Sequence, residues 1–369
     1  MSDFLPIKGI DHVEFYVGNA KQAAHYYRSA FGFANTAYSG LETGKRQRAS
    51  YVMEQGKIRL VLSTALSPDH PISRHVYLHG DGAAVIALSV PDAADAYREA
   101  TTRGATGALL PVQEEDEHGV LRYSAIRAYG DTLIKFVDRS DYGGSFAPGY
   151  VARRPSANDK ANGRHVGYGL AHIDHIVGNV DLGAMNRWVD FFANTMGFRQ
   201  MVHFDDRDIS TEYSALMSKV MQDGTGKVKF PINEPAEGKR KSQIQEYLDY
   251  YFGPGVQHLA LSTGDIIESV LKLQENGVEF LYVPTTYYEE LESRVGKINE
   301  PVDKLAELGI LVDRDDDGYL LQIFTKPVED RPTLFFEIIE RHGSRGFGKG
   351  NFKALFESIE REQARRGNL

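Results

Sequence analysis

The sequence of 369 residues contains no cysteine. Disulfide bonds, thiolate nucleophiles and iron–sulfur or zinc sites with cysteine ligands are therefore excluded. Any metal site in this chain must be built from histidine, aspartate and glutamate side chains. The search for a functional site can begin with the positions of those three residue types.

The sequence also lacks long apolar runs and dense basic segments. No stretch approaches the roughly 18 consecutive apolar residues that a membrane-spanning helix needs. Residues 1–20 mix charged and apolar side chains, unlike a signal peptide. The formal net charge is -9, which argues against nucleic acid as the main partner. We therefore expect a cytoplasmic protein with neither a membrane nor a nucleic-acid partner.

An internal repeat organises the chain. A strand is predicted over residues 9–19, where it ends in a Gly-Asn turn, and an amphipathic helix over 20–31. The same order returns over 173–179 and 185–196, and a glycine again follows the helix. Each half contains two strand–helix–three-strand units. The repeat predicts an α+β fold of four βαβββ modules in two domains of curved mixed sheet.

The boundary between the two domains is predicted in the segment 142–169. This segment is rich in Gly, Arg, Ser, Asn and Pro and shows no apolar periodicity. We expect an N-terminal domain over residues 1–155 and a C-terminal domain over 170–369.

One carboxylate lies inside an apolar strand predicted over residues 333–341. Glu337 has Phe336 and Ile338 as its direct neighbours. An ionised glutamate at such a position costs several kcal/mol unless it is paired, hydrogen-bonded or bound to a metal. Glu337 therefore requires a partner from another part of the chain.

Two histidines are candidates for that partner. His175 and His258 lie in two other predicted strands of the second half, and each alone is more often a hydrogen-bonded core residue than a ligand. Together with Glu337 they predict a metal site, because two imidazoles and one carboxylate suit non-haem Fe(II) and oxygen chemistry. Ligand type alone also allows Zn(II). His172 points to the opposite face of its strand from His175, so we expect at most one of these two histidines to be a ligand.

The repeat permits a comparison of the two halves. At the equivalent places the first half has His12, Val85 and Phe136. One possible ligand remains there and two side chains are apolar. A single histidine does not hold a catalytic divalent metal, so we expect the first domain to be metal-free and to serve packing or assembly.

Several longer segments form a more specific pattern. They are Ile173-Asp174-His175, Pro231-Ile232-Asn233-Glu234-Pro235, Lys241-Ser242-Gln243-Ile244, Val256-Gln257-His258, the run 318–325, Phe336-Glu337-Ile338-Ile339 and the run 346–352. With these segments in this order, the chain resembles the 4-hydroxyphenylpyruvate dioxygenase family of the vicinal-oxygen-chelate superfamily over essentially its whole length. The resemblance implies an open barrel of curved mixed sheet in the C-terminal domain, with Fe(II) inside it.

The resemblance also implies roles for individual residues. The iron ligands would be His175, His258 and Glu337. The polar residues near the substrate would be Ser214, Asn233, Gln243, Gln257 and Gln322. The apolar walls would be Phe324, Phe335, Phe347 and Phe352. A helix over residues 350–366 would close over the pocket, and no catalytic residue beyond the metal ligands is expected.

The reaction that the resemblance implies converts 4-hydroxyphenylpyruvate and O2 into homogentisate and CO2. It combines oxidative decarboxylation, ring hydroxylation and side-chain migration, and belongs to tyrosine and phenylalanine catabolism. The expected partners are thus a small 2-oxo acid and O2, and we expect a homo-oligomer. Two alternatives remain: a 4-hydroxymandelate synthase, which hydroxylates the benzylic carbon of the same substrate, and a metal-free binding protein on the same fold.

Overall fold

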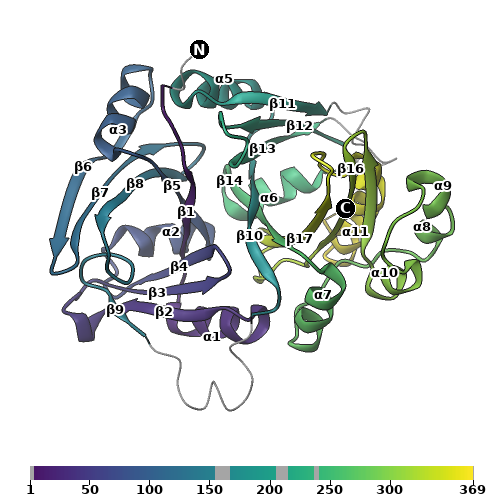
Figure 1. Cartoon of the computed structure of the whole chain (residues 1–369), viewed down its shortest axis with the longest axis horizontal. Coiled ribbons are helices and arrows are strands. Elements are labelled where there is room, and N and C mark those ends of the chain that lie inside the picture. Colours follow the sequence, from purple (N-terminus) through teal and green to yellow (C-terminus); the bar gives the residue numbers. More distant parts are fainter. Residues whose placement is uncertain (1–3, 154–166, 205–214, 237–240, 369) are drawn as a thin grey trace.

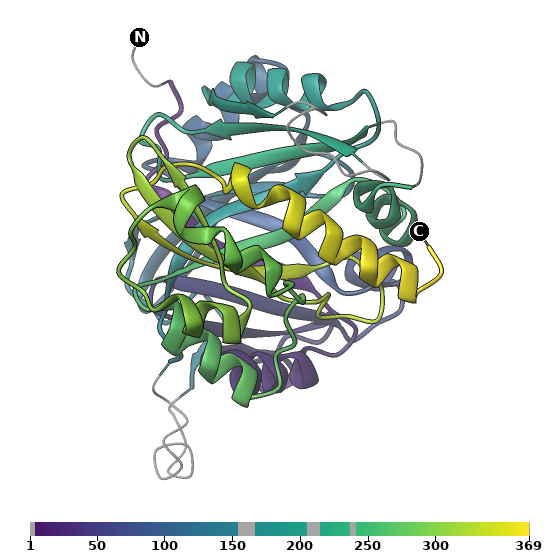
Figure 2. The ribbon, with the colours of Figure 1, turned by 90° about the vertical axis from the view of Figure 1, so that its right-hand side faces the viewer.

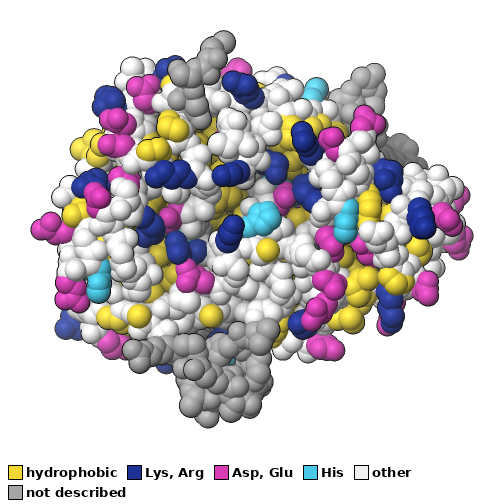
Figure 3. Space-filling model, in the orientation of Figure 1, with side chains coloured by type: hydrophobic (Ala, Val, Ile, Leu, Met, Phe, Trp, Pro, Cys, Tyr) yellow, Lys and Arg dark blue, Asp and Glu magenta, His cyan; other side chains and the backbone are white. Residues whose placement is uncertain are grey.

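The computed structural model describes residues 4–153, 167–204, 215–236 and 241–368. The chain forms two strongly curved sheets that lie side by side, each folded around its own interior (Figure 1). None of the described helices is long and apolar enough to cross a membrane. On the face drawn in Figure 3, basic and acidic side chains are interspersed over both halves.

The first half contains the nine-stranded sheet, in the order β6-β7-β8-β5-β1-β4-β3-β2-β9. Its elements are β1 (Gly9–Tyr16), α1 (Ala20–Phe31), β2 (Ala34–Ser39), η1 (Leu41–Thr43), β3 (Arg48–Gln55), β4 (Ile58–Ala65), α2 (Pro71–His79), β5 (Gly82–Ser89), α3 (Ala93–Thr102), β6 (Gly107–Asp116), β7 (Gly119–Arg127), β8 (Leu133–Tyr142) and β9 (Val151–Ala152).

The second half contains the eight-stranded sheet, in the order β11-β12-β13-β10-β14-β17-β16-β15. Its elements are β10 (Leu170–Asn179), α5 (Met185–Met196), β11 (Arg199–Phe204), β12 (Ala215–Gln222), β13 (Lys229–Ala236), α6 (Gln243–Tyr251), β14 (Gly255–Thr263), α7 (Ile266–Glu275), α8 (Thr286–Glu289), α9 (Leu291–Val295), α10 (Val302–Leu308), β15 (Leu311–Asp315), β16 (Gly318–Phe324), β17 (Phe335–His342), η2 (Lys349–Asn351) and α11 (Phe352–Arg365).

The predicted repeat and fold class are confirmed by the pairing of the strands. β1 is parallel to β4 and antiparallel to β5, which is in turn parallel to β8. β10 has the same relations to β13, β14 and β17. Because both sheets have this central order, residues of one half can be matched with residues of the other by their register.

The predicted helix bounds over 20–31 and 185–196 are also confirmed, because local signals fix both ends of the first helix and the end of the second. The Asn19 side chain accepts the backbone N–H of Gln22 at the start of α1. Gly32 and Gly197 end α1 and α5 with φ values of 74° and 73°, in the left-handed region that favours glycine.

One predicted correspondence between the halves is wrong. Ala260 of β14 pairs with Glu337 of β17. The matching Ala87 of β5 pairs with Lys135 of β8, so Lys135 and not Phe136 occupies the place of Glu337. Strand side chains alternate between faces, and a shift of one residue therefore exchanges an interior position for one on the opposite face. Phe136 is fully buried in the hydrophobic core.

The contact between the two halves orients the strand that carries Glu337. Phe336 of β17 packs against helix α1 of the first half, with ring centroids 5.0 Å from Phe31 and 5.9 Å from Tyr27. Since neighbouring residues of a strand point to opposite faces, Glu337 points into the second sheet. The apolar contact on one face thus places the carboxylate on the other.

Candidate metal centre

Three side chains from three strands converge on the inner face of the second sheet. His175 comes from β10, His258 from β14 and Glu337 from β17. The Oε2 atom of Glu337 lies 3.1 Å from Nε2 of His175 and 3.4 Å from Nε2 of His258. Two ligand atoms that each lie about 2.1 Å from an ion, at right angles to each other, are about 3.0 Å apart. The observed spacing therefore fits a divalent metal ion.

The hydrogen bonds of the two imidazoles determine which ring nitrogen carries the hydrogen and which one is left to face Glu337. Nδ1 of His175 lies 2.8 Å from Oδ1 of Asp174, and Nδ1 of His258 lies 3.0 Å from Oε1 of Gln257. Both oxygens accept, so each neutral ring carries its hydrogen on Nδ1 and presents a lone pair on Nε2. Two nitrogen lone pairs and a carboxylate then point at one place, which is favourable only around a cation.

The pKa shifts of these groups have the same origin. Burial lowers the pKa of His258. Burial also works to lower the pKa of His175, but the charges of Glu337 and Asp174 outweigh it and raise that pKa. Burial alone would raise the pKa of Glu337, yet the neighbouring imidazoles lower it to about 2. A proton on Nε2 of His175 and a divalent ion are thus alternative partners of Glu337.

A second layer of contacts holds the imidazole of His175 in place. Arg341 donates from Nε and Nη2 to the two oxygens of Asp174, at 2.8 Å each. Despite its burial, these bonds and the bond to His175 hold the pKa of Asp174 well below its usual range. Arg341 also donates to the backbone carbonyl of Gly346 at 2.7 Å. The arginine thereby connects a ligand's partner to the segment that precedes α11.

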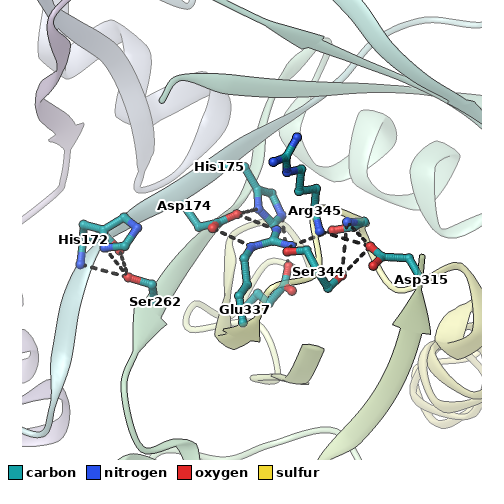
Figure 4. A network of polar contacts seen from close by, with 10 residues as sticks. His172, Asp174, His175, Ser262, Asp315, Glu337, Ser344 and Arg345 are labelled. Atoms are coloured by element: carbon teal, nitrogen blue, oxygen red, sulfur yellow. Dashed lines mark hydrogen bonds and ion pairs between the residues drawn. The ribbon is translucent and has the colours of Figure 1, made fainter. Parts of the chain in front are cut away.

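That segment has a further anchor in Asp315, drawn in Figure 4. Oδ2 of Asp315 accepts from the Ser344 hydroxyl at 2.6 Å and from the backbone N–H of Arg345 at 3.0 Å. The anchored segment presents Phe347 to the centre, where its ring lies 5.1 Å from the ring of His175.

His172 lies apart from the centre, as Figure 4 shows. Its Nδ1 is 2.6 Å from the hydroxyl of Ser262, and its backbone N–H donates to the same oxygen at 3.2 Å. The group of close ligand atoms contains His175 and does not contain His172. The expectation that at most one of these two histidines points to the site is confirmed.

A pocket of about 80 Å³ adjoins the three candidate ligands. Seven of the residues predicted near the substrate line it: Asn233, Gln243, Gln257, Phe324, Phe335, Phe347 and Phe352. Helix α11 runs across this part of the second sheet (Figure 2). Phe352, Leu355, Phe356 and Ile359 of α11 form one side of the pocket. The helix predicted over 350–366 thus corresponds to η2 and α11 and covers the pocket.

Two of the predicted polar residues are not seen on the pocket wall. Ser214 lies outside the described residues. Gln322 is buried beside Gly348, and neither atom of its amide makes a hydrogen bond among the described residues. Gln322 lies two residues before Phe324 on β16 and so shares its inner face, but its amide packs against Gly348 and not against the pocket.

Other residues at the site were not predicted. Ser218 and Pro231 line the pocket, and Asp174 and Arg341 hold His175. The signal for the last two was present in the repeat: both halves contain Asp-His in the first strand and an arginine in the last one. That recurrence would have identified the pair as a matched unit.

The comparisons with known proteins agree with this geometry. A family model described as "Hydroxyphenylpyruvate dioxygenase, HPPD, N-terminal" matches residues 2–147. A second, "Glyoxalase/Bleomycin resistance protein/Dioxygenase superfamily", matches residues 169–323. The 4-hydroxyphenylpyruvate dioxygenase of Dictyostelium discoideum is 49% identical over 98% of this chain and 100% of the relative.

Two further proteins extend the comparison. The 4-hydroxyphenylpyruvate dioxygenase of Tetrahymena thermophila is 48% identical over 98% of this chain and 91% of its own length. Among solved structures, a mutant of 4-hydroxymandelate synthase from Streptomyces coelicolor superposes with a TM-score of 0.85 at 29% identity. That alignment covers 97% of this chain and 100% of the other. The solved structure shares the fold of this chain over nearly the whole length of both chains.

Proposed function

The chain belongs to the 4-hydroxyphenylpyruvate dioxygenase family, and from this premise we propose that its second sheet holds an Fe(II) centre. Its activity is that of the family, the conversion of 4-hydroxyphenylpyruvate and O2 into homogentisate and CO2. The observation that carries the proposal is the convergence of two imidazole nitrogens and a buried carboxylate beside a pocket lined largely by apolar side chains.

His175, His258 and Glu337 would hold the ion. When bound, Fe(II) supplies redox chemistry with dioxygen and a positive centre for the two oxygens of a 2-oxo acid. The protein supplies orientation and excludes water. No general base is needed, and we assign none.

The apolar side chains around the ligands fix the reacting geometry. Phe335 stacks on the ring of His258, with centroids 4.6 Å apart and planes 22° apart. Phe324 meets the same ring nearly edge-on at 6.1 Å. These contacts leave the His258 ring little freedom to rotate. They also line the pocket with hydrocarbon, which keeps bulk water away from the substrate.

We assign the phenol end of the substrate to the polar side of the pocket. Asn233, Gln243 and Ser218 lie on that wall. Gln257 has a divided role, because its carbonyl oxygen accepts from His258 while its NH2 group remains able to donate to a substrate oxygen. Ser214 belongs to this proposed set, although it lies outside the described residues.

The test is to supply the protein with 4-hydroxyphenylpyruvate, Fe(II) and O2 and to identify the product. We expect homogentisate. The high structural similarity to 4-hydroxymandelate synthase makes hydroxymandelate the second candidate product. Hydroxymandelate without homogentisate would overturn the proposal, because the two reactions begin from the same substrate and differ in the carbon that is hydroxylated.

A pair of histidine variants tests the centre itself. His258→Ala should lose tightly bound iron and turnover. His172→Ala, which removes an imidazole hydrogen-bonded to Ser262 and outside the group of candidate ligands, should retain both. Metal analysis of the purified proteins measures the first quantity. Equal iron content in the two variants would contradict the assignment of the ligands. This would hold even if His258→Ala had lost its turnover.

Four expectations remain proposals. The division into residues 1–155 and 170–369 is supported by the separate family matches to each half. A homo-oligomer is expected, and sedimentation analysis would test it. The cytoplasmic location and the place in tyrosine and phenylalanine catabolism rest on family membership and composition.

A further inference from the structure

The first sheet encloses a cavity of about 370 Å³. This volume lies within the range of roughly 300–1,000 Å³ that small-molecule sites occupy. It exceeds the pocket of about 80 Å³ beside the candidate metal ligands, where four side chains of α11 reach into the space. No helix corresponding to α11 is among the residues that line the cavity of the first half, where Phe146, Pro148 and Tyr150 contribute to the wall.

The first half repeats the outer contacts of the candidate metal centre. Asp11 lies 2.5 Å from Nδ1 of His12 and accepts from Arg139 at 2.7 and 2.9 Å. Arg139 also donates to the backbone carbonyl of Phe146, whose ring lies 5.2 Å from His12. Asp11, His12 and Arg139 hold the strand positions of Asp174, His175 and Arg341. Phe146 contacts the ring of His12 as Phe347 contacts the ring of His175.

The interior positions differ. Val85 stands where His258 stands in the second sheet, and Lys135 stands where Glu337 stands. The second half thus has a carboxylate facing its pocket, and the first half has an ammonium group facing its cavity. The change of sign removes a site for a cation and creates a position that favours an anion.

The ammonium group of Lys135 is attracted through space by Glu14 and Asp11 and repelled by Arg48 and Arg139. Its Nζ makes no hydrogen bond or ion pair within the part of the chain that the structure describes, and its nearest recorded partner is the ring of Tyr123 at 4.2 Å from the ring centroid. Burial lowers the pKa of Lys135. A half-buried ammonium without hydrogen bonds is unfavourable, and an anion in the cavity would relieve that cost.

The other charged groups on the wall leave a positive excess. Glu14, which also lines the cavity, is already engaged by the hydroxyl of Ser63 at 2.6 Å and by Arg48 at 3.5 Å. Lys45, Arg48 and Lys135 face the cavity together with only two carboxylates, Glu14 and Glu114. The remaining wall is mostly aromatic and aliphatic, with Tyr16, Tyr123 and Phe146 among its members.

We propose that this cavity binds a small organic monoanion, a carboxylate with an apolar or aromatic body, whose carboxylate lies against Lys135. The carboxylate would take the hydrogen bonds that the ammonium lacks, and the body would lie against the aromatic wall. The site is separate from the candidate metal centre and does not depend on the function proposed for that centre.

The test uses 4-bromophenylacetate as the probe, with 2-(4-bromophenyl)ethanol as its neutral control. Anomalous scattering from bromine in a soaked crystal of the metal-loaded protein would place each probe, and calorimetry would give its affinity. We expect a bromine peak inside the first sheet for the acid. Binding of the acid should weaken at least about tenfold in Lys135→Met and be retained in Lys135→Arg, since the lost contact is charge-assisted.

A second variant keeps the proposal testable if Lys135→Met fails to fold. Ala125 lines the cavity at the position that Phe324 occupies in the second half, so Ala125→Phe should fill the cavity while the charges stay in place. It should abolish binding in the first sheet. Bromine peaks only at the metal centre, or equal affinity of Lys135→Met and the parent for the acid, would overturn the proposal.

Turnover separates this proposal from the assigned activity. Lys135 and Ala125 lie outside the metal centre, so both variants should convert 4-hydroxyphenylpyruvate as the parent does. A parent that gives no homogentisate but binds the acid beside Lys135 would refute the proposed function and leave this site standing.

Discussion

Substituting Asp174 with asparagine should weaken metal binding without removing any ligand. The Asp174 carboxylate accepts three charge-assisted hydrogen bonds, one from Nδ1 of His175 and two from Arg341, each at 2.8 Å. An asparagine has one accepting oxygen. If that oxygen faces His175, its NH2 group faces the cationic Arg341. If the NH2 group faces His175, it favours the tautomer that carries the proton on Nε2, the atom needed for the metal.

Either arrangement lowers the affinity of the centre. Loss of such an outer partner typically reduces metal affinity about 10- to 100-fold, which corresponds to about 1.4–2.7 kcal/mol. The assay is a competitive titration of the apoprotein with Fe(II) or Co(II) against a chelator of known affinity. We expect Asp174→Asn to shift the midpoint by one to two decades while the stoichiometry stays unchanged.

The repeat provides a matched control in Asp11→Asn. Asp11 makes the same contacts with His12 and Arg139, at 2.5, 2.7 and 2.9 Å, but no candidate ligand group surrounds it among the described residues. This variant should lose comparable folding stability and keep the parent's metal affinity. If both variants lost affinity equally, the effect would be one of general stability, and the role assigned to Asp174 would be refuted.

Three further predictions follow from other parts of the fold. Burial lowers the pKa of His75 to about 4. Between about pH 6.5, the ordinary pKa of histidine, and pH 4, the unfolded chain therefore binds a proton at His75 that the native protein does not bind. The free energy of unfolding should therefore fall by up to about 3 kcal/mol from this group between pH 6.5 and 4. Denaturant titrations should show that the free energy of unfolding falls less on acidification in His75→Phe than in the parent or in the exposed-site control His118→Phe. An equal pH dependence in all three proteins would contradict this prediction. The double variant Val85→His, Lys135→Glu should bind a second metal ion in the first sheet, measured as metal content per chain. A metal content equal to that of the parent would show that the contacts of Asp11 with His12 and Arg139 do not suffice to build a metal site around the new ligands. Removal of residues 350–369 should reduce turnover far more than it reduces the melting temperature, because α11 closes the pocket. Unchanged turnover would remove that role.

Two of the three candidate ligands stand out in the sequence, and His175 was predicted only in combination with them. Glu337 is a carboxylate in an apolar strand, and the repeat showed that His258 has an apolar counterpart. The first helix could be bounded to the residue because its two ends carry short-range signals, a capping asparagine and a terminal glycine. Short-range chemistry of this kind is present in the sequence itself.

The register between strands could not be predicted in the same way. The Thr-Leu pairs at residues 132–133 and 333–334 align by sequence, yet the strands pair one residue out of step with that alignment. Hydrogen bonding with the neighbouring strand sets the register, and no single residue in β8 encodes it. For the same reason, the sequence alone did not show that Lys135 occupies the place of Glu337 in the first sheet.

The comparison of the two halves also separates what stabilises the fold from what binds the metal. The buried pair of Asp11 and Arg139 is present in the first half, where the interior residues are Val85 and Lys135. Breaking a buried ion pair by removing one partner costs about 3–5 kcal/mol, so the pair has a structural reason to persist without any ion nearby. An aspartate–arginine pair behind a strand histidine is therefore no evidence of a metal by itself. The evidence lies in the inner positions: the sign of one side chain, carboxylate or ammonium, decides whether the sheet encloses a site for a cation or for an anion.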